Sequence, residues 1–150
     1  MEIQENLKST GMVTVSHFNK QGELLNTFEV PNLVVTTGKN FIASRLKDTT
    51  FAAMSHMAIG TSASAAAATD TTLVSEGGRV GLSSTTVSTN TVTYTATFPA
   101  GTGTSTSPGV QEAGVFNASS GGTLLCRTVF PSVAKAAGDS IAITWVITVS

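Results

Sequence analysis

The sequence has little charge and a single cysteine. Only 11% of its 150 residues are charged, and 8 Lys and Arg against 9 Asp and Glu give a formal net charge of -1. Typical soluble domains have about 25% charged residues, and binding to nucleic acid or to a membrane surface requires a concentrated basic patch. We therefore expect no nucleic-acid partner and no membrane partner. Cys126 alone cannot form an intramolecular disulfide or a multi-cysteine zinc site.

Two further signals are missing. Met1 to Glu5 lacks the basic and apolar regions of a signal peptide, and no apolar run reaches the roughly 18 residues that a membrane span needs. We expect a soluble protein made in the cytoplasm.

Between Arg79 and Glu112 no residue is charged. Because isolated domains usually keep charge on their surface, this neutral stretch indicates a surface that lies against other copies or other subunits.

The residues that are abundant favour β-structure. Thr occurs 25 times and Ser 17 times, while hydrophobic residues reach 41% and mean hydropathy is +0.22. Disordered chains show the opposite, with low hydrophobicity and high net charge. The chain is also long enough to bury about 68–70% of its unfolded surface. One domain with its own core is expected.

Alternation of apolar and polar residues predicts the strands. Residues 91–98 and 140–150 alternate with the period of two that a half-buried strand requires. Residues 12–18 and 24–30 flank a polar loop that contains Gly22, and residues 114–117 and 123–130 flank another that contains Gly121, so each pair predicts a hairpin. A short strand is expected at 54–60, loops at 61–72 and 101–109, and a turn at 131–139.

One helix is expected at residues 37–47. Its apolar stripe would consist of Phe41, Ile42 and Leu46, with Thr36 or Thr37 as the N-cap. Recurring strands and turns with a single helix predict a mainly β fold, a single β-sandwich or barrel-like domain over residues 12–150, with residues 1–11 as an N-terminal arm.

Catalytic and metal-binding patterns are weak. His17 and His56 lie in predicted strands, where a hydrogen-bonded structural role is more common than catalysis. A metal site from these histidines with Glu76 or Asp70 has no spacing signal. The Gly38-Lys39 pair lacks the remaining residues of a phosphate-binding loop, and no G-x-S-x-G motif occurs.

The remaining reactive groups also favour structural roles. Cys126 is predicted to be a buried, inert thiol. Glycosidase-like carboxylate pairs, Glu112 with Asp139 or Glu76 with Asp70, are less favoured than solvated or salt-bridged roles. Glu112 is expected either to protect an edge strand or to contact Arg79 or Arg127 across a subunit interface. We expect no enzyme activity, no cofactor and no metal, with Arg79, Glu112 and Arg127 as interface residues.

Segments spread over residues 30–149 resemble a pattern found in small structural proteins of tailed bacteriophages. The segments are 32–40, 57–62, 71–73 with Glu76 and Arg79, 112–117, 123–130, Lys135, Gly138-Asp139 and 141–149. This resemblance implies a β-rich virion component, made in the host cytoplasm, that assembles as an oligomer and binds other virion proteins.

The resemblance leaves two functional alternatives. The first is a capsid decoration or cement protein that bridges subunits of the major capsid protein, with residues 1–11 as an arm that reaches a neighbour. The second is a neck, baseplate or tail-fibre module, with the loops at 61–72 and 101–109 as receptor contacts. Receptor binding is the weaker hypothesis, because aromatic residues, which often stack on sugars, make up only 6% of the chain.

Overall fold

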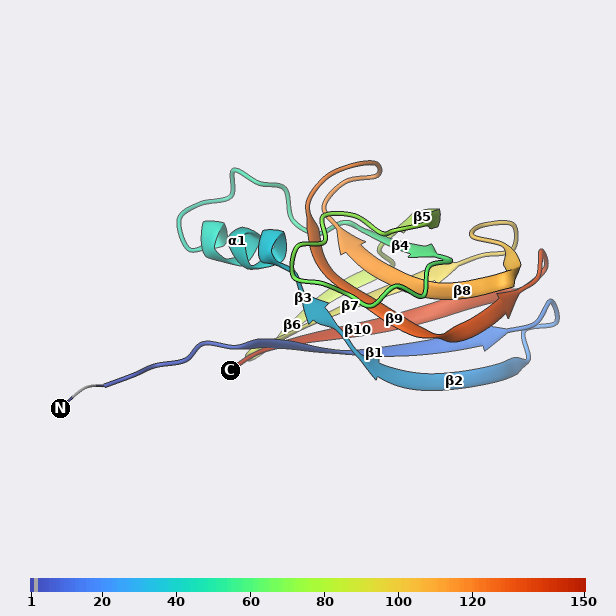
Figure 1. The fold of residues 1–150 in the computed structure, drawn as a ribbon, viewed down its shortest axis with the longest axis horizontal. Helices are drawn as coiled ribbons and strands as arrows, with labels where there is room; N and C mark the ends of the chain where they lie inside the picture. Colours follow the sequence, from blue (N-terminus) through green and yellow to red (C-terminus); the bar gives the residue numbers. More distant parts are fainter. Residues whose placement is uncertain (2) are drawn as a thin grey trace.

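The chain folds into two antiparallel five-stranded sheets that pack face to face (Figure 1). The structure is a computed structural model and describes residues 1 and 3–150. The first sheet has the order β2-β1-β10-β7-β6 and is called sheet A; the second has the order β3-β9-β8-β4-β5 and is called sheet B. The elements are β1 (Ser9–Phe18), β2 (Leu24–Pro31), β3 (Leu33–Val34), α1 (Thr36–Arg45), β4 (His56–Gly60), β5 (Glu76–Gly81), β6 (Ser84–Ser88), β7 (Thr91–Phe98), β8 (Ser105–Phe116), β9 (Leu124–Lys135) and β10 (Ser140–Val149).

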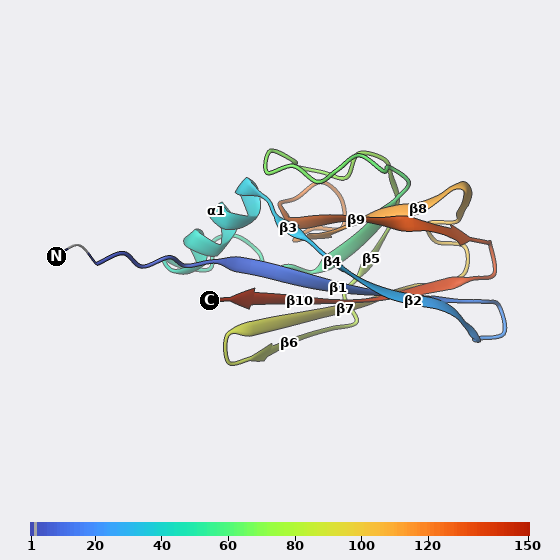
Figure 2. The ribbon, with the colours of Figure 1, turned by 60° about the horizontal axis from the view of Figure 1, so that its bottom comes forward.

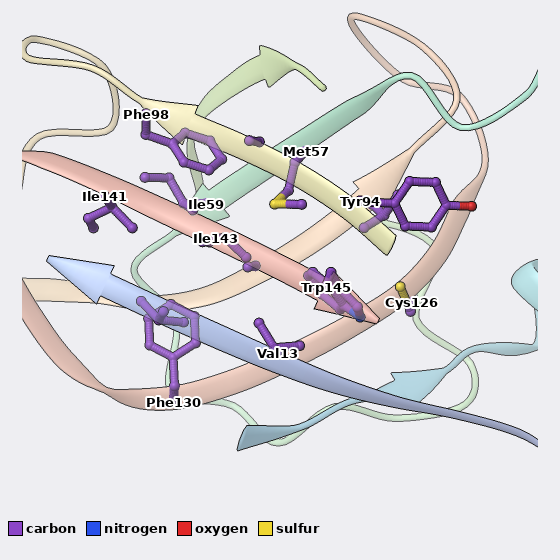
Figure 3. Close-up of a cluster of buried hydrophobic side chains, with 14 of the residues drawn as sticks. Val13, Met57, Ile59, Tyr94, Phe98, Cys126, Phe130, Ile141, Ile143 and Trp145 are labelled. Atoms are coloured by element: carbon purple, nitrogen blue, oxygen red, sulfur yellow. The ribbon is translucent and has the colours of Figure 1, made fainter. Parts of the chain in front are cut away.

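The predicted mainly β fold is confirmed, and it is a sandwich of two sheets. The inward-facing residues of both sheets form the core shown in Figure 3, which includes Val13, Met57, Phe98, Phe130 and Trp145. In β10 every second residue from Ile141 to Ile147 is buried, in agreement with the alternation of the sequence. Because burying one such side chain contributes about 1.5–3 kcal/mol, this core is the main source of stability.

The predicted helix is confirmed as α1, but its N-cap residue and its contacts with sheet B differ from expectation. Val35 is the N-cap and makes no capping side-chain hydrogen bond, while the Thr37 hydroxyl donates to the Leu124 carbonyl at 2.8 Å. Leu46 follows the helix and is 88% exposed, so it is not part of an apolar stripe. Instead Gly38 is buried directly against the backbone of β9, where the absence of a side chain allows close approach.

Two segments predicted as a loop and a turn are parts of strands. β8 begins at Ser105, inside the predicted loop at 101–109, and β9 continues through Pro131 to Lys135, inside the predicted turn at 131–139. Pro131 is tolerated because β3 pairs with β9 only at Arg127 and Cys126, which leaves the strand without a β3 partner beyond that point. The proline therefore removes no hydrogen bond between these two strands.

Strands also begin earlier than predicted or occur where no alternation is visible. β1 starts at Ser9, so residues 9–11 pair with β10 and belong to sheet A, and the described part of the arm comprises residues 1 and 3–8. The sequence does not predict β5 and β6, because β5 is rich in glycine and β6 contains only Ser and Thr besides Val87. Such strands have no apolar face from which a period of two could be recognised.

The outer faces of the two sheets differ. A loop formed by residues 61–75 crosses sheet B on its outer side, where Leu73 packs with Val35, Ala58, Phe116 and Leu124 in a second apolar cluster (Figure 1). A tight turn lies within this loop, where the Asp70 N–H donates to the Ala67 carbonyl at 3.0 Å. In neither view does a loop of the described residues cross the outer face of sheet A (Figures 1 and 2).

Candidate functional site

Glu112 and Arg127 form a fully buried ion pair between β8 and β9. The Arg127 Nε and Nη2 atoms donate to Glu112 Oε2 at 3.0 and 2.8 Å. Nη1 donates to the carboxylate of Asp70 at 3.0 Å, and Nη2 also donates to the Ser64 carbonyl at 2.9 Å. Both side chains of the central pair are completely inaccessible to solvent. The guanidinium therefore joins sheet B to the loop that covers it.

The carboxylate of Glu112 also holds the same loop directly. It accepts the Val74 N–H at 3.1 Å and the Ser75 N–H at 2.7 Å. Gly60 provides the space, because a Cβ atom at this position would lie 2.5 Å from Glu112 Oε1 and closer still to the Ser75 carbonyl oxygen. A buried carboxylate is tolerable when it is paired and hydrogen-bonded in this way. These hydrogen bonds hold residues 61–75 against sheet B, and we call the cluster the Glu112–Arg127 clamp.

Arg79 forms a separate cluster on the same sheet. Its Nε and Nη2 atoms each donate to the Glu76 carboxylate at 2.8 Å, and Nη1 donates to the carbonyls of Ala118 and Gly121 at 2.9 Å. The guanidinium carbon also lies 3.7 Å from the centre of the Phe116 ring, in a cation–π contact. This arginine thus ties the β8–β9 hairpin loop to β5.

Arg79, Glu112 and Arg127, which the sequence predicts as interface residues, make these contacts within one chain. Glu112 lies in β8, which is between β9 and β4 and is not an edge strand. Each of the three side chains has its partners inside the same chain, and Glu112 and Arg127 are inaccessible to a partner. The sequence contains a signal for the central pairing: Glu112 and Arg127 are isolated charges among apolar residues, and a buried charge requires a partner of opposite sign.

His17, Asp139 and Lys135 gather at the opposite end of the sandwich. His17 Nε2 lies 2.8 Å from Asp139 Oδ2, which also accepts the Ala136 N–H at 3.0 Å. The Lys135 ammonium donates to the carbonyls of Pro99 and Asp139 at 3.0 and 2.8 Å. Burial lowers the pKa of Lys135, and the hydrogen bond from His17 lowers the pKa of Asp139. The group connects the ends of β1, β7 and β9.

The lowered pKa of Asp139 predicts acid sensitivity. Because the folded-state pKa lies below the unfolded value, the carboxylate stabilises the fold above the unfolded pKa, near 4, and this contribution is lost as the pH falls through the folded pKa. We expect Asp139→Asn to lower the free energy of unfolding by about 1 kcal/mol near pH 7 and by less near pH 3. Urea unfolding at both pH values measures this; a difference independent of pH would contradict it.

Cys126 is fully buried, as the sequence predicts. Burial raises the pKa of its thiol, which keeps the sulfur protonated. We expect iodoacetamide to modify the native chain at least about 100-fold more slowly than the urea-unfolded chain, because the thiolate is the reactive form. Mass spectrometry over time measures this. Equal rates in both states would show that the thiol is accessible in the folded protein.

Other candidate groups take local structural roles. His56 Nδ1 lies 2.8 Å from the Ser55 hydroxyl. Within residues 1 and 3–150, no group of three or more His, Cys, Asp or Glu side chains is arranged to hold a metal ion. No helix in this part of the chain is long and apolar enough to cross a membrane. The titratable clusters that are present hold loops and strand ends in place.

The outer face of sheet A is a broad surface that no loop of the described residues covers. The alternation of each strand places the following residues on it: Thr27, Glu29 and Pro31 of β2; Thr10, Met12, Thr14, Ser16 and Phe18 of β1; Ser140, Ala142, Thr144, Val146 and Thr148 of β10; Thr91, Thr93, Thr95 and Thr97 of β7; Ser84, Thr86 and Ser88 of β6. Glu29 is the only charged residue among these. The face is therefore rich in hydroxyl groups and poor in charge, and Met12 on it is 46% exposed.

The N-terminal arm is a second feature of the surface. It leaves the sandwich beside the C-terminus and runs beyond the end of sheet A (Figure 2). Met1, Ile3 and Leu7 are 114%, 80% and 75% exposed.

Comparison with protein-family models, with curated proteins and with solved structures finds no match for this chain.

Proposed function

We propose that this chain is a non-enzymatic structural protein of a tailed-bacteriophage virion, and that it decorates the capsid by bridging major capsid protein subunits. The proposal starts from the resemblance of residues 30–149 to small virion proteins. The observation that carries it is the outer face of sheet A, which is broad and poor in charge and which no loop of the described residues crosses.

The size of this face suits a contact between subunits. With strands about 4.8 Å apart and about 3.3 Å per residue, five strands of about eight residues cover roughly 600 Å² in projection. A stable interface buries about 800 Å² on each partner, so the face supplies most of that area. Its hydroxyl groups donate and accept hydrogen bonds, and its low charge avoids the cost of desolvating ions.

The charged clusters support a structural role in another way. The Glu112–Arg127 clamp and the Arg79 cluster hold the loops of sheet B, and the His17–Asp139 pair holds the far end of the sandwich. A rigid domain loses little conformational entropy on binding, and this favours reinforcement of a shell. Bridging adds binding free energy across subunit boundaries and so opposes their separation.

The test is to locate and count the chain in intact particles, by cryo-electron microscopy or by gel densitometry against the major capsid protein. Copies spread over the whole shell are expected. A few copies at one vertex or along the tail would overturn the decoration role and favour the alternative of a neck, baseplate or tail-fibre module.

A variant tests the surface itself. Thr144→Arg places a charge at the centre of the outer face of sheet A, and Thr71→Arg places the same charge on the exposed loop over sheet B. We expect Thr144→Arg to abolish binding to purified shells and Thr71→Arg to leave it unchanged. Equal binding by both variants would show that another surface makes the contact.

A further inference from the structure

The strands at the edges of the two sheets differ in how they are protected against pairing with another chain. An edge strand leaves the N–H and C=O groups of alternate residues unpaired, and proteins usually protect it with charge, proline, a bulge or short length. Sheet A ends at β2 and β6, and sheet B ends at β3 and β5. Among the described residues, three of these strands carry such a feature and β6 does not.

The three protected edges use different features. β2 contains Glu29 and ends at Pro31, and its register with β1 is irregular. β5 contains Glu76 and Arg79, and its register with β4 is also irregular. β3 is only two residues long. A strand that approached any of these edges would meet a charge, a missing N–H donor or too few residues to pair with.

β6 is a regular and neutral strand. All five of its residues are exposed: Ser84, Thr85, Thr86, Val87 and Ser88. Its register with β7 is continuous, and Figure 2 shows it at the border of sheet A, beyond β7. Since no residue between Arg79 and Glu112 is charged, β7 and the turn that joins the two strands are neutral as well. A second neutral strand can therefore approach β6 without repulsion between like charges.

Val87 shows which part of β6 a partner would cover. It is 69% exposed, although its register partner is Val92, which packs against the core and lines an apolar pocket between α1, β7 and β10. Residues directly opposite each other in a sheet share a face, so Val87 lies on the inner face, at a position that sheet B does not cover. A strand added beyond β6 would remove part of this apolar surface from water.

The sequence of β6 fits a second copy of itself. In antiparallel pairing about a twofold axis at Thr86, this residue lies opposite its own copy. Ser84 then lies opposite Ser88, and Thr85 lies opposite Val87. Cross-strand pairs of hydroxyl-bearing and β-branched residues stabilise antiparallel strands. The backbone donors and acceptors also match, because each strand presents the same set to the other.

The lack of charge favours a second copy over a strand of a different protein. An edge that binds a different protein gains specificity from charges that complement those of its partner. In a pairing of β6 with itself, a charge at Thr86 would face its like across the axis, and charges elsewhere on the strand would lie close to their copies. The neutral composition of β6 meets the requirement of the second case.

We infer that two copies of this chain pair antiparallel through β6, and that their five-stranded A sheets join into one continuous sheet. The inference rests on the proposed function for its purpose: the two outer faces form one face of twice the breadth, which can reach across a boundary between capsid protein subunits. Two strands of five residues bury less than the roughly 800 Å² per partner of a standard interface. A weak, reversible dimer is therefore expected in solution.

The first experiment is sedimentation velocity of the purified full chain over a range of concentrations at low ionic strength. We expect a monomer–dimer equilibrium whose Kd rises at least about tenfold in Thr86→Lys, because the two introduced ammonium groups would face each other. The matched control is Thr27→Lys, which places the same charge at an exposed position on the opposite edge of sheet A. A chain that stays monomeric up to about 1 mM, or an equal loss in the control, would overturn the inference.

The second experiment tests whether Thr86 faces its own copy. We expect Thr86→Glu alone to weaken the dimer as Thr86→Lys does. An equal mixture of the two variants should dimerise at least as well as the native chain, because an introduced ammonium then faces an introduced carboxylate. A mixture no more dimeric than either variant alone would refute the pairing. Since no shell is present, this failure is distinct from failure of the decoration role, which the count of copies in particles decides.

Discussion

Arg127→Met is expected to lower the free energy of unfolding by about 3–5 kcal/mol, because it leaves a buried carboxylate without its counter-ion. Glu112 is fully inaccessible and accepts two of its hydrogen bonds from Arg127. Its other hydrogen-bond donors are the N–H groups of Val74 and Ser75, which do not neutralise a charge. Asp70 would also lose its contact, so the loop at 61–75 should loosen.

The double variant Glu112→Gln with Arg127→Met provides the comparison. It removes both charges, while the amide oxygen of the introduced glutamine can still accept a hydrogen bond from the loop. Replacing a whole buried pair is often far less costly than breaking it. We expect the double variant to recover more than half of the loss in urea unfolding. If it is as unstable as the single variant, the cost arises from lost packing of the arginine stem and not from an unpaired charge.

Gly38→Ala is expected to destabilise the fold by about 1–3 kcal/mol, the cost of overpacking a closely packed site. In an exposed helix interior the same change normally stabilises by about 1 kcal/mol. Here an added Cβ would overlap the Leu125 carbonyl oxygen and lie 2.7 Å from the carbon of that carbonyl. These are backbone atoms of β9, so the helix would have to move away from the sheet.

The control for Gly38→Ala is Asn40→Ala, at an exposed position of the same helix. Thermal unfolding should show a lower Tm for the first variant and an equal or higher Tm for the second, because alanine favours helix where nothing clashes. A higher Tm for both variants would contradict the close contact between α1 and β9.

Local patterns account for most of the strands. The alternation in residues 91–98 and 140–150 predicts both the strands and their buried faces, since one side of each strand must be apolar to cover a core. The same rule fails for β6, whose Ser and Thr residues carry no apolar face. It also fails at Pro131, which is acceptable within β9 because β3 ends before it and the β8–β9 register is irregular around it.

The sequence by itself determined the fold class, the neutral character of the surface and the burial of Cys126, because each follows from residue type and short-range spacing. Only the tertiary structure decided the partners of its isolated charges. Glu112 and Arg127 are neighbours because β8 and β9 pair, and Asp70 joins them because a loop crosses sheet B. The apolar pocket between α1, β7 and β10 likewise depends on elements far apart in the chain. Contacts over such separations arise from packing, which local sequence patterns do not encode.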